Sequence, residues 1–277
     1  MGIQKINKVS AINYFGGKYQ WLEQLYKYFP EHTHFLDLFC GSMTVTLNKL
    51  ASNLDTANDL DGSVINFFKV LREQPDELLH LLYLTPVARQ EYKNCFPIYS
   101  DDPIEWARKF FVRCRMSFQG SGLKEHTGFN ACVNTTEKSL SKNVSKYLSA
   151  VERLPEVVER LKRIQIESLD YKECIKKYDR KETFIYVDPP YELRMRNYKK
   201  WYNLEFENDN DHIDLRDSLT GIKSMAMVSG YESDFYMDLY KDWEFIKLQP
   251  KKHSMKGAKL QEECIWINYP HVKKTLF

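Results

Sequence analysis

Short runs of apolar residues recur along the chain at intervals that suit the strands of a buried sheet. The candidate strands cover residues 35–39, 164–166, 183–187, 225–228, 244–248 and 264–269. The clearest is 183–187, Thr-Phe-Ile-Tyr-Val, which is rich in β-branched and aromatic residues. Brief apolar runs of this kind are typical of strands that are covered on both faces.

Apolar residues at helical spacing fall between these runs. They predict helices over residues 18–29, 44–50, 64–72 and 155–161. Strands that alternate with helices indicate an α/β fold with an open, mostly parallel sheet, and residues 243–269 would close it as a hairpin.

The middle of the chain has a different pattern. Residues 73–146 begin with a helical stretch, continue through a mixed basic and aromatic segment at 106–118, and end in a region rich in Gly, Ser, Thr and Asn. The sequence therefore predicts two parts. Residues 1–72 and 147–277 form a catalytic domain, and residues 73–146 form a mainly helical insert with a long loop.

The net charge of the 277-residue chain is only +2, which excludes a polycationic nucleic-acid coat. Basic residues nevertheless gather at 108–115, 194–200 and 251–259. Such clusters are solvated faces in most proteins, but they also follow phosphate backbones. The aromatic content of 14% also has two explanations: the rings fill the core, or some are exposed and stack on bases.

The six cysteines are scattered, without Cys-x-x-Cys pairs or neighbouring histidines at zinc-site spacing. We expect reduced cysteines, no metal, and a cytoplasmic protein. The N-terminus lacks the apolar run of a signal peptide, and no stretch has the length of a membrane span. A monomer is the default expectation.

Two candidate ligand contacts follow from the rule that open α/β sheets bind ligands at the carboxyl ends of strands. Gly41 follows the 35–39 run, where a glycine lets the backbone turn close to a ligand. Any strand-to-helix connection also uses such a turn. Asp59 lies 22 residues beyond Asp37, a spacing that suits a carboxylate accepting two ribose hydroxyls. A helix cap before Val64 is the other explanation.

The most specific signal is Asp188-Pro189-Pro190-Tyr191, directly after the 183–187 run. The prolines cannot extend the ladder of hydrogen bonds, and they stiffen the turn. The Asp188 carboxylate and the Pro189 carbonyl then form a pair of acceptors that matches the two N–H donors of an amino group. The Tyr191 ring can stack on a planar base. A plain structural turn is the alternative.

These motifs resemble those of a known family. Residues 188–191 look like the catalytic motif of amino-methyltransferases, which methylate adenine at its 6-amino or cytosine at its 4-amino group. Tyr14-Phe15-Gly16-Gly17-Lys18 resembles the aromatic-x-Gly-Gly-Lys motif of the bacterial and phage DNA adenine methyltransferase family. Residues 35–47 are similar to its cofactor loop, Asn58-Asp59 to its ribose-binding acid, Asp170 to a further acid near the cofactor adenine, and 263–270 to its closing strand.

The resemblance implies a Rossmann-like methyltransferase fold in which residues 73–146 recognise the target sequence. The implied cofactor is S-adenosyl-L-methionine, bound by Tyr14, Gly16, Gly17, Lys18, Asp37, Phe39, Gly41, Asp59, Asp170 and Asp188. The implied catalytic residues are Asp188, Pro189, Pro190 and Tyr191. The substrate would be double-stranded DNA with a flipped adenine, methylated directly without a metal or a covalent enzyme intermediate.

The chain departs from the family pattern in two places. The cofactor loop of the family reads Phe-x-Gly-x-Gly, whereas here Met43 replaces the second glycine. We expect its side chain to crowd the cofactor and to weaken its binding. Residues 120–130 resemble the family's GATC-reading loop only loosely, and its arginine has no counterpart. The candidate DNA contacts are Arg113, Arg115, Gln119, Lys124 and His126, with structural roles open for the arginines.

Two other functions fit parts of the pattern. A cytosine 4-amino methyltransferase would use the same pair of acceptors, although the motif order and Gly16-Gly17-Lys18 favour adenine. A catalytically silent DNA-binding protein would result if Met43 abolished cofactor binding. Asp188, rather than Asn, before the two prolines argues against a glutamine-methylating enzyme. A restriction system, a phage and a regulatory pathway all remain open as settings.

Overall fold

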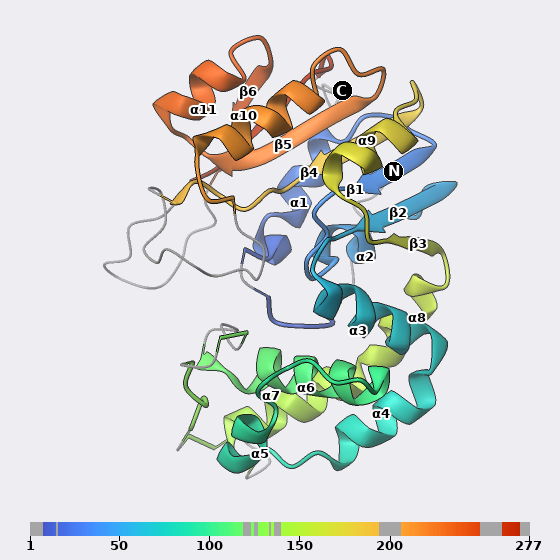
Figure 1. The fold of residues 1–277 in the computed structure, drawn as a ribbon, viewed down its shortest axis with the longest axis vertical. Helices are drawn as coiled ribbons and strands as arrows, with labels where there is room; N and C mark the ends of the chain where they lie inside the picture. Colours follow the sequence, from blue (N-terminus) through green and yellow to red (C-terminus); the bar gives the residue numbers. More distant parts are fainter. Residues whose placement is uncertain are drawn as a thin grey trace, which may run out of the picture.

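A central β-sheet organises the computed structural model, which describes residues 8–14, 16–118, 123–124, 127–132, 134–135, 140–193, 206–249 and 262–271 (Figure 1). Within these ranges the sheet has seven strands in the order β3-β2-β1-β4-β5-β7-β6. The strands are β1 His34–Asp37, β2 Leu54–Asn58, β3 Ile164–Glu167, β4 Thr183–Val187, β5 Met225–Tyr231, β6 Glu244–Lys247 and β7 Glu263–Ile267.

Most of the sheet is parallel. β1 pairs in parallel with both β2 and β4, β2 pairs with β3, and β4 pairs with β5. β7 lies between β5 and β6 and is antiparallel to both. This arrangement confirms the predicted α/β, Rossmann-like fold with a mostly parallel sheet, including the closing hairpin. It also brings the carboxyl ends of β1, β2 and β4 to the same edge.

Helices cover both faces of the sheet, because alternate side chains of each strand point to opposite sides. Leu36 and Ile185 lie in one apolar core with residues of α9, α10 and α11. Phe35 and Phe184 lie in another core, with residues of α1 and α2. The covering helices are α1 Leu22–Leu25, α2 Thr44–Asn48, α9 Tyr171–Tyr178, α10 Asp209–Ser218 and α11 Asp234–Leu239.

A group of helices stands below the sheet in Figure 1 and holds its own apolar core. It comprises α3 Gly62–Glu73, α4 Pro75–Leu84, α5 Arg89–Asn94, α6 Pro103–Met116, α7 Lys142–Glu152 and α8 Leu154–Leu161. Phe67 of α3 stacks on Phe111 of α6, with ring centroids 5.9 Å apart. The predicted boundary between residues 146 and 147 falls inside α7, and the division into two domains stays a prediction.

One local prediction differs from the structure, and one strand has no counterpart among the predictions. The expected helix over 18–29 is instead a chain of short turns: the 3-10 helix Lys18–Gln20, α1, and the 3-10 helix Tyr26–Tyr28. Its aromatic side chains pack against the sheet core, and that packing outweighs helical periodicity. β2 was not predicted at all, since its Asp55 is polar yet buried, paired with the side chains of Lys49 and Arg160.

Candidate active site

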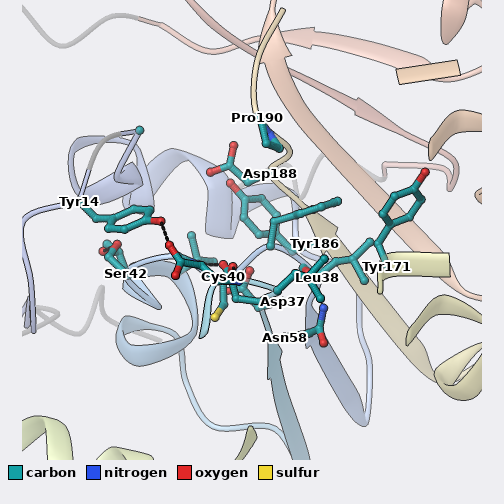
Figure 2. Close-up of a pocket in the computed structure, with 18 of the residues that line it drawn as sticks. Tyr14, Asp37, Leu38, Cys40, Ser42, Asn58, Tyr171, Tyr186, Asp188 and Pro190 are labelled. Atoms are coloured by element: carbon teal, nitrogen blue, oxygen red, sulfur yellow. Dashed lines mark hydrogen bonds between the residues drawn. The ribbon is translucent and has the colours of Figure 1, made fainter. Parts of the chain in front are cut away.

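A pocket of about 290 Å³ opens at the carboxyl ends of β1, β2 and β4. Every residue predicted to contact the cofactor lines it: Tyr14, Gly16, Gly17, Lys18, Asp37, Phe39, Gly41, Asp59, Asp170 and Asp188. Figure 2 shows Tyr14 on one side, Tyr171 on the other, and Asp188 with Pro190 above Asp37. Segments far apart in sequence therefore meet in one cavity because the parallel strands end together.

The floor of the pocket is formed where β1 ends. The Asp37 carboxylate accepts a hydrogen bond of 2.5 Å from the Thr46 hydroxyl of α2. Burial raises the pKa of Asp37 to about 7, and the charges of Asp188 and Asp59 add to the rise. The ionised form of this carboxyl is therefore favoured when a positively charged group binds above it.

Gly41 forms the turn after β1 and requires the absence of a side chain. Its φ is +45°, and a Cβ atom there would lie 3.2 Å from two atoms of the Tyr14 ring. Its amide donates to Asp59 Oδ2 at 2.8 Å, while Asp59 Oδ1 accepts from the Asp61 amide at 2.9 Å. Burial raises the pKa of Asp59 to about 6. Asp59 thus joins the end of β2 to the glycine turn and faces the pocket.

An aromatic wall closes the side of the pocket next to α9. Phe39, Tyr171 and Phe206 lie with ring centroids between 5.9 and 6.1 Å of one another. Asp170 caps α9 by accepting from the Lys172 amide at 2.9 Å. The sequence pattern did not indicate Tyr171 or Phe206, because single aromatic residues in loops and helix starts carry no periodic signal.

The Asp188 carboxylate is held from two sides at the rim of the pocket. The Lys18 ammonium lies 2.7 Å from each of its oxygens, and the Ser229 hydroxyl donates to Oδ1 at 2.8 Å. Lys18 reaches this place because Gly16 and Gly17 turn the chain, with the Gly17 amide donating to the Tyr14 carbonyl at 3.3 Å. Lys18 is therefore tied to the turn at Asp188 as well as to the pocket.

Tyr191 lies beside this ion pair and is fixed by Glu263 of β7. The Tyr191 hydroxyl donates to the Glu263 carboxylate, and the Tyr231 ring packs edge-on at 4.6 Å between centroids. Glu263 Oε1 is also 3.5 Å from the Lys18 ammonium. The sequence placed Glu263 only in the closing strand; neither it nor Ser229 was identified as a site residue.

Met43 does not crowd the pocket, which corrects the expectation from the sequence. Its side chain is fully buried in the apolar core below the sheet, and it is absent from the pocket wall. The backbone at Met43 has a φ of +52°, in the left-handed region that glycine adopts without strain. The replaced family glycine thus corresponds to a backbone requirement rather than to space for a ligand.

Arg113 has the structural role that the sequence left open as the alternative to a direct contact with DNA. Its residue surface is 1% exposed, and its guanidinium lies 4.1 Å from the Tyr92 ring centroid. It donates to the carbonyls of Tyr92 at 3.3 Å and Lys124 at 2.5 Å. Buried guanidinium groups bonded in this way fix loops and offer no surface to a phosphate.

The other candidate DNA contacts differ in position. Arg115 is partly exposed and donates to the carbonyls of Ser10 and Ala11 at 2.6 and 2.7 Å. Lys124 is also partly exposed, and its role in DNA binding stays a prediction. Gln119, His126 and the basic clusters at 194–200 and 251–259 lie outside the described residues.

The described ranges show neither a metal-site cluster nor a membrane-spanning helix. In these parts of the chain, no three or more His, Cys, Asp or Glu side chains come together as a metal site would require. None of the helices there combines the length and apolar character needed to cross a bilayer. The six cysteines are unbridged, and five are buried.

Comparison with known proteins gives a family match over residues 14–255, to the D12 class N6 adenine-specific DNA methyltransferases. The type II methyltransferase M1.LlaDCHI of Lactococcus lactis subsp. cremoris is 26% identical over 292 residues, covering 96% of this chain and 97% of that protein. The DNA N-6-adenine-methyltransferase of Escherichia phage P1 is 30% identical over 118 residues, 40% of this chain and 15% of that protein.

The DNA adenine methylase of Vibrio cholerae is 25% identical over 183 residues, which cover 64% of this chain and 62% of that protein. The family match includes Tyr14, Asp37, Asp59 and the turn at Asp188, so it spans the pocket described above. Because that match extends over most of the sequence, the chain belongs to the D12 class N6 adenine-specific DNA methyltransferase family.

Proposed function

We propose that this protein methylates the 6-amino group of adenine in DNA, with S-adenosylmethionine as the methyl donor. The observation that carries the proposal is the Asp188 carboxylate, held by Lys18 and Ser229 at the rim of a pocket and next to the Tyr191 ring. A fixed acceptor beside an aromatic ring suits an amino group on a planar base.

The pocket residues fit S-adenosylmethionine. Asp37 and Asp59 supply carboxylates for a cofactor that carries positive charge and a ribose diol, and Phe39 with Tyr171 offers aromatic surface for its adenine. A side chain at Gly41 would meet the Tyr14 ring, so the glycine keeps this part of the wall open. When bound, the cofactor supplies a methyl group that is already activated by a sulfonium centre.

The protein's own contribution is then mainly positioning. The Asp188 carboxylate and the Pro189 carbonyl each accept a hydrogen bond from one N–H of the target amino group. These two bonds orient its nitrogen toward the pocket. Tyr191 stacks on the flipped base and fixes its plane. Holding the reacting groups in this way removes much of the entropic barrier to an in-line transfer.

A second cavity supports a path for the DNA. It lies between the N-terminal segment, α6 and α7, and its wall carries the basic side chains of Arg115, Lys146 and Arg153. The cavity wall also includes Ser10 and Asn13, while the next residue, Tyr14, lines the cofactor pocket. We propose that phosphates of double-stranded DNA rest on these basic groups while an adenine is flipped toward Asp188. One chain carries every group invoked, so the proposed working unit is a monomer.

The direct test is to incubate the protein with DNA and labelled S-adenosylmethionine and to identify the methylated nucleoside by mass spectrometry. We expect 6-methyladenine from the wild type and none from Asp188→Ala. The control is Asp217→Ala, which removes an exposed carboxylate of α10 away from the pocket and should keep the wild-type rate.

Two results would contradict the proposed function. One is formation of 4-methylcytosine alone, and the other is transfer by Asp188→Ala at the wild-type rate. Long-read sequencing of DNA from cells that express the protein would add the recognition sequence.

A further inference from the structure

Behind the catalytic turn, one ammonium group faces two carboxylates. Lys18 Nζ lies 2.7 Å from both oxygens of Asp188 and 3.5 Å from Oε1 of Glu263. The side chains of Lys18 and Glu263 are only 4% and 5% exposed. Tyr191 completes the cluster, since its hydroxyl donates to Glu263 and its ring centroid is 4.8 Å from the ammonium.

The two carboxylates compete for this ammonium. Among the residues that the structure describes, this cluster places two negative charges beside one positive charge, away from water, and such a group is short of one counter-charge. The shorter distances show that the ammonium is committed to Asp188. Burial raises the pKa of Glu263; Lys18 opposes that rise, while the charge of Asp188 adds to it. Within the described part of the chain, Glu263 is accordingly the carboxylate that the Lys18 ammonium approaches less closely.

This state is not the one that the reaction needs. The target amino group has to donate to Asp188, whose two oxygens both face the Lys18 ammonium. An ammonium there also disfavours positive charge that develops on the attacking nitrogen. Moving Lys18 away without another partner would leave a buried cation unpaired, which is strongly unfavourable. Glu263, whose Oε1 is already 3.5 Å from the ammonium, is a second carboxylate within reach of the flexible lysine stem.

We propose that Glu263 is a positioning residue, which takes over the Lys18 ammonium when the target amino group engages Asp188 and which holds Tyr191 by its hydroxyl throughout. The inference rests on the proposed function and assigns a role to a residue of β7 that does not line the cofactor pocket. Glu263 acts through Lys18 and Tyr191, and it touches neither the base nor the cofactor.

The test compares Glu263→Gln with Glu262→Gln. The first substitution keeps an oxygen that can accept from Tyr191 but removes the charge offered to Lys18. The second makes the same chemical change one residue away, on a more exposed side chain paired with Lys247. We expect Glu263→Gln to lower kcat on the order of 10²-fold, as misplacement of reacting groups does, with little change in KM for DNA. Glu262→Gln is expected to keep the wild-type kcat and KM. Glu263→Asp, which keeps the charge, is expected to have a kcat between those of Glu263→Gln and the wild type.

Two measurements do not depend on turnover. Calorimetric titration with S-adenosylmethionine should give the same affinity for Glu263→Gln as for the wild type, because Glu263 is outside the pocket wall. DNA with 2-aminopurine at the target position reports base capture by its fluorescence. We expect a smaller rise in fluorescence with Glu263→Gln than with the wild type. Without the charge of Glu263, the Lys18 ammonium stays on Asp188, and the base is captured less often.

The outcomes separate the two proposals. If the wild type forms no 6-methyladenine, the proposed function fails, and the role of Glu263 falls with it. If the wild type is active and folded Glu263→Gln matches it in kcat and in 2-aminopurine fluorescence, only the role of Glu263 is overturned. Should Glu263→Gln fail to fold, Tyr191→Phe carries the test, because it removes the hydroxyl while leaving both charges. Wild-type fluorescence and kcat in Tyr191→Phe would then contradict the proposal.

Discussion

At the scale of single residues, two backbone positions in the loop after β1 have positive φ but different neighbours. Gly41 has a φ of +45° and faces the Tyr14 ring, whereas Met43 has a φ of +52° and places its side chain in the apolar core. A left-handed residue other than glycine costs about 1–2 kcal/mol. Burial of the Met43 side chain offsets a cost of this size, since burying a methionine is worth roughly 1.5–3 kcal/mol.

Gly41→Ala is expected to weaken cofactor binding as well as stability. The new Cβ would lie 3.2 Å from the Tyr14 ring, which lines the pocket. Gly221→Ala is the matched control, because Gly221 has a φ of +72° and a Cβ there would meet nothing within 4 Å. Both variants should lose about 1–2 kcal/mol of unfolding free energy in denaturant titrations. Only Gly41→Ala should raise the Kd for S-adenosylmethionine; an equal Kd for the two variants and the wild type would contradict this.

Cofactor affinity is expected to rise with pH between about 5 and 7.5, in line with proton linkage. Burial holds the pKa of Asp37 at about 7 and that of Asp59 at about 6, so both carboxyls become charged over this range. S-adenosylmethionine is a net cation there and favours the ionised forms. Its demethylated product lacks the sulfonium charge and should show a flatter profile. Calorimetry across the pH range tests this, and parallel profiles for the two ligands would refute it.

At the scale of elements, β2 carries a buried ion cluster, which a pattern of hydrophobic residues does not reveal. Asp55 is 1% exposed and pairs with Lys49 at 2.7 Å and with Arg160 of α8 at 2.5 Å. Burial raises the pKa of Asp55, but the two cations outweigh burial and hold the pKa below its usual value. These contacts tie β2 to α8 and to the chain after α2.

Asp55→Asn is expected to lower the unfolding free energy by about 3–5 kcal/mol, because two buried cations lose their partner. The depressed pKa means that the stabilisation is complete above the unfolded pKa of about 4 and is lost as pH falls through the lower folded value. The variant should therefore lose less stability on acidification than the wild type. Glu159→Gln, which breaks an exposed pair with Lys162, should change stability by less than about 1 kcal/mol. Equal losses in the two variants, measured by denaturant titration, would contradict this.

The sequence predicted the elements whose side chains follow a simple period. β4 was located with its observed bounds, and α3 and α8 were found from their apolar stripes. Over 18–29 the aromatic side chains serve the sheet core from short turns, so tertiary packing overrode the local pattern. The pocket was predictable because its residues follow strand ends in recognisable motifs. Glu263 was not, because its contact with Tyr191 arises only when antiparallel β7 pairs beside β5.

At the scale of the whole molecule, the N-terminal segment joins the sheet to the helices below it. The Val9 amide and carbonyl bond to the Asn48 side chain at 2.7 and 2.9 Å, next to the sheet. Arg115 of α6 holds the Ser10 and Ala11 carbonyls, and Arg153 donates to the Lys8 carbonyl at 2.6 Å. Figure 1 shows this segment running between the two halves of the molecule.

Lys146→Ala is expected to weaken DNA binding in a salt-dependent way. Lys146 is exposed on α7 and lines the basic cavity, so its loss should reduce the slope of log K against log salt by about 0.9. The maximal rate with saturating DNA should not change. Lys162→Ala is the control, because Lys162 is exposed on the chain after α8 but does not line that cavity. Fluorescence anisotropy at several salt concentrations measures the slope, and equal slopes for the two variants would refute the proposed path.

The position of β7 has a consequence for how the enzyme is made. β7 follows every other strand in chain order, yet it enters the sheet between β5 and β6 and brings Glu263 to Tyr191. During synthesis the earlier strands and the Asp188 turn leave the ribosome first. The hydrogen bond from Tyr191 to Glu263 is therefore missing until β7 inserts, so a nascent chain has the residues of the pocket before it has the contact that holds Tyr191. Loss of the segment from residue 263 onward would remove both the carboxylate that accepts from Tyr191 and the strand that joins β5 to β6.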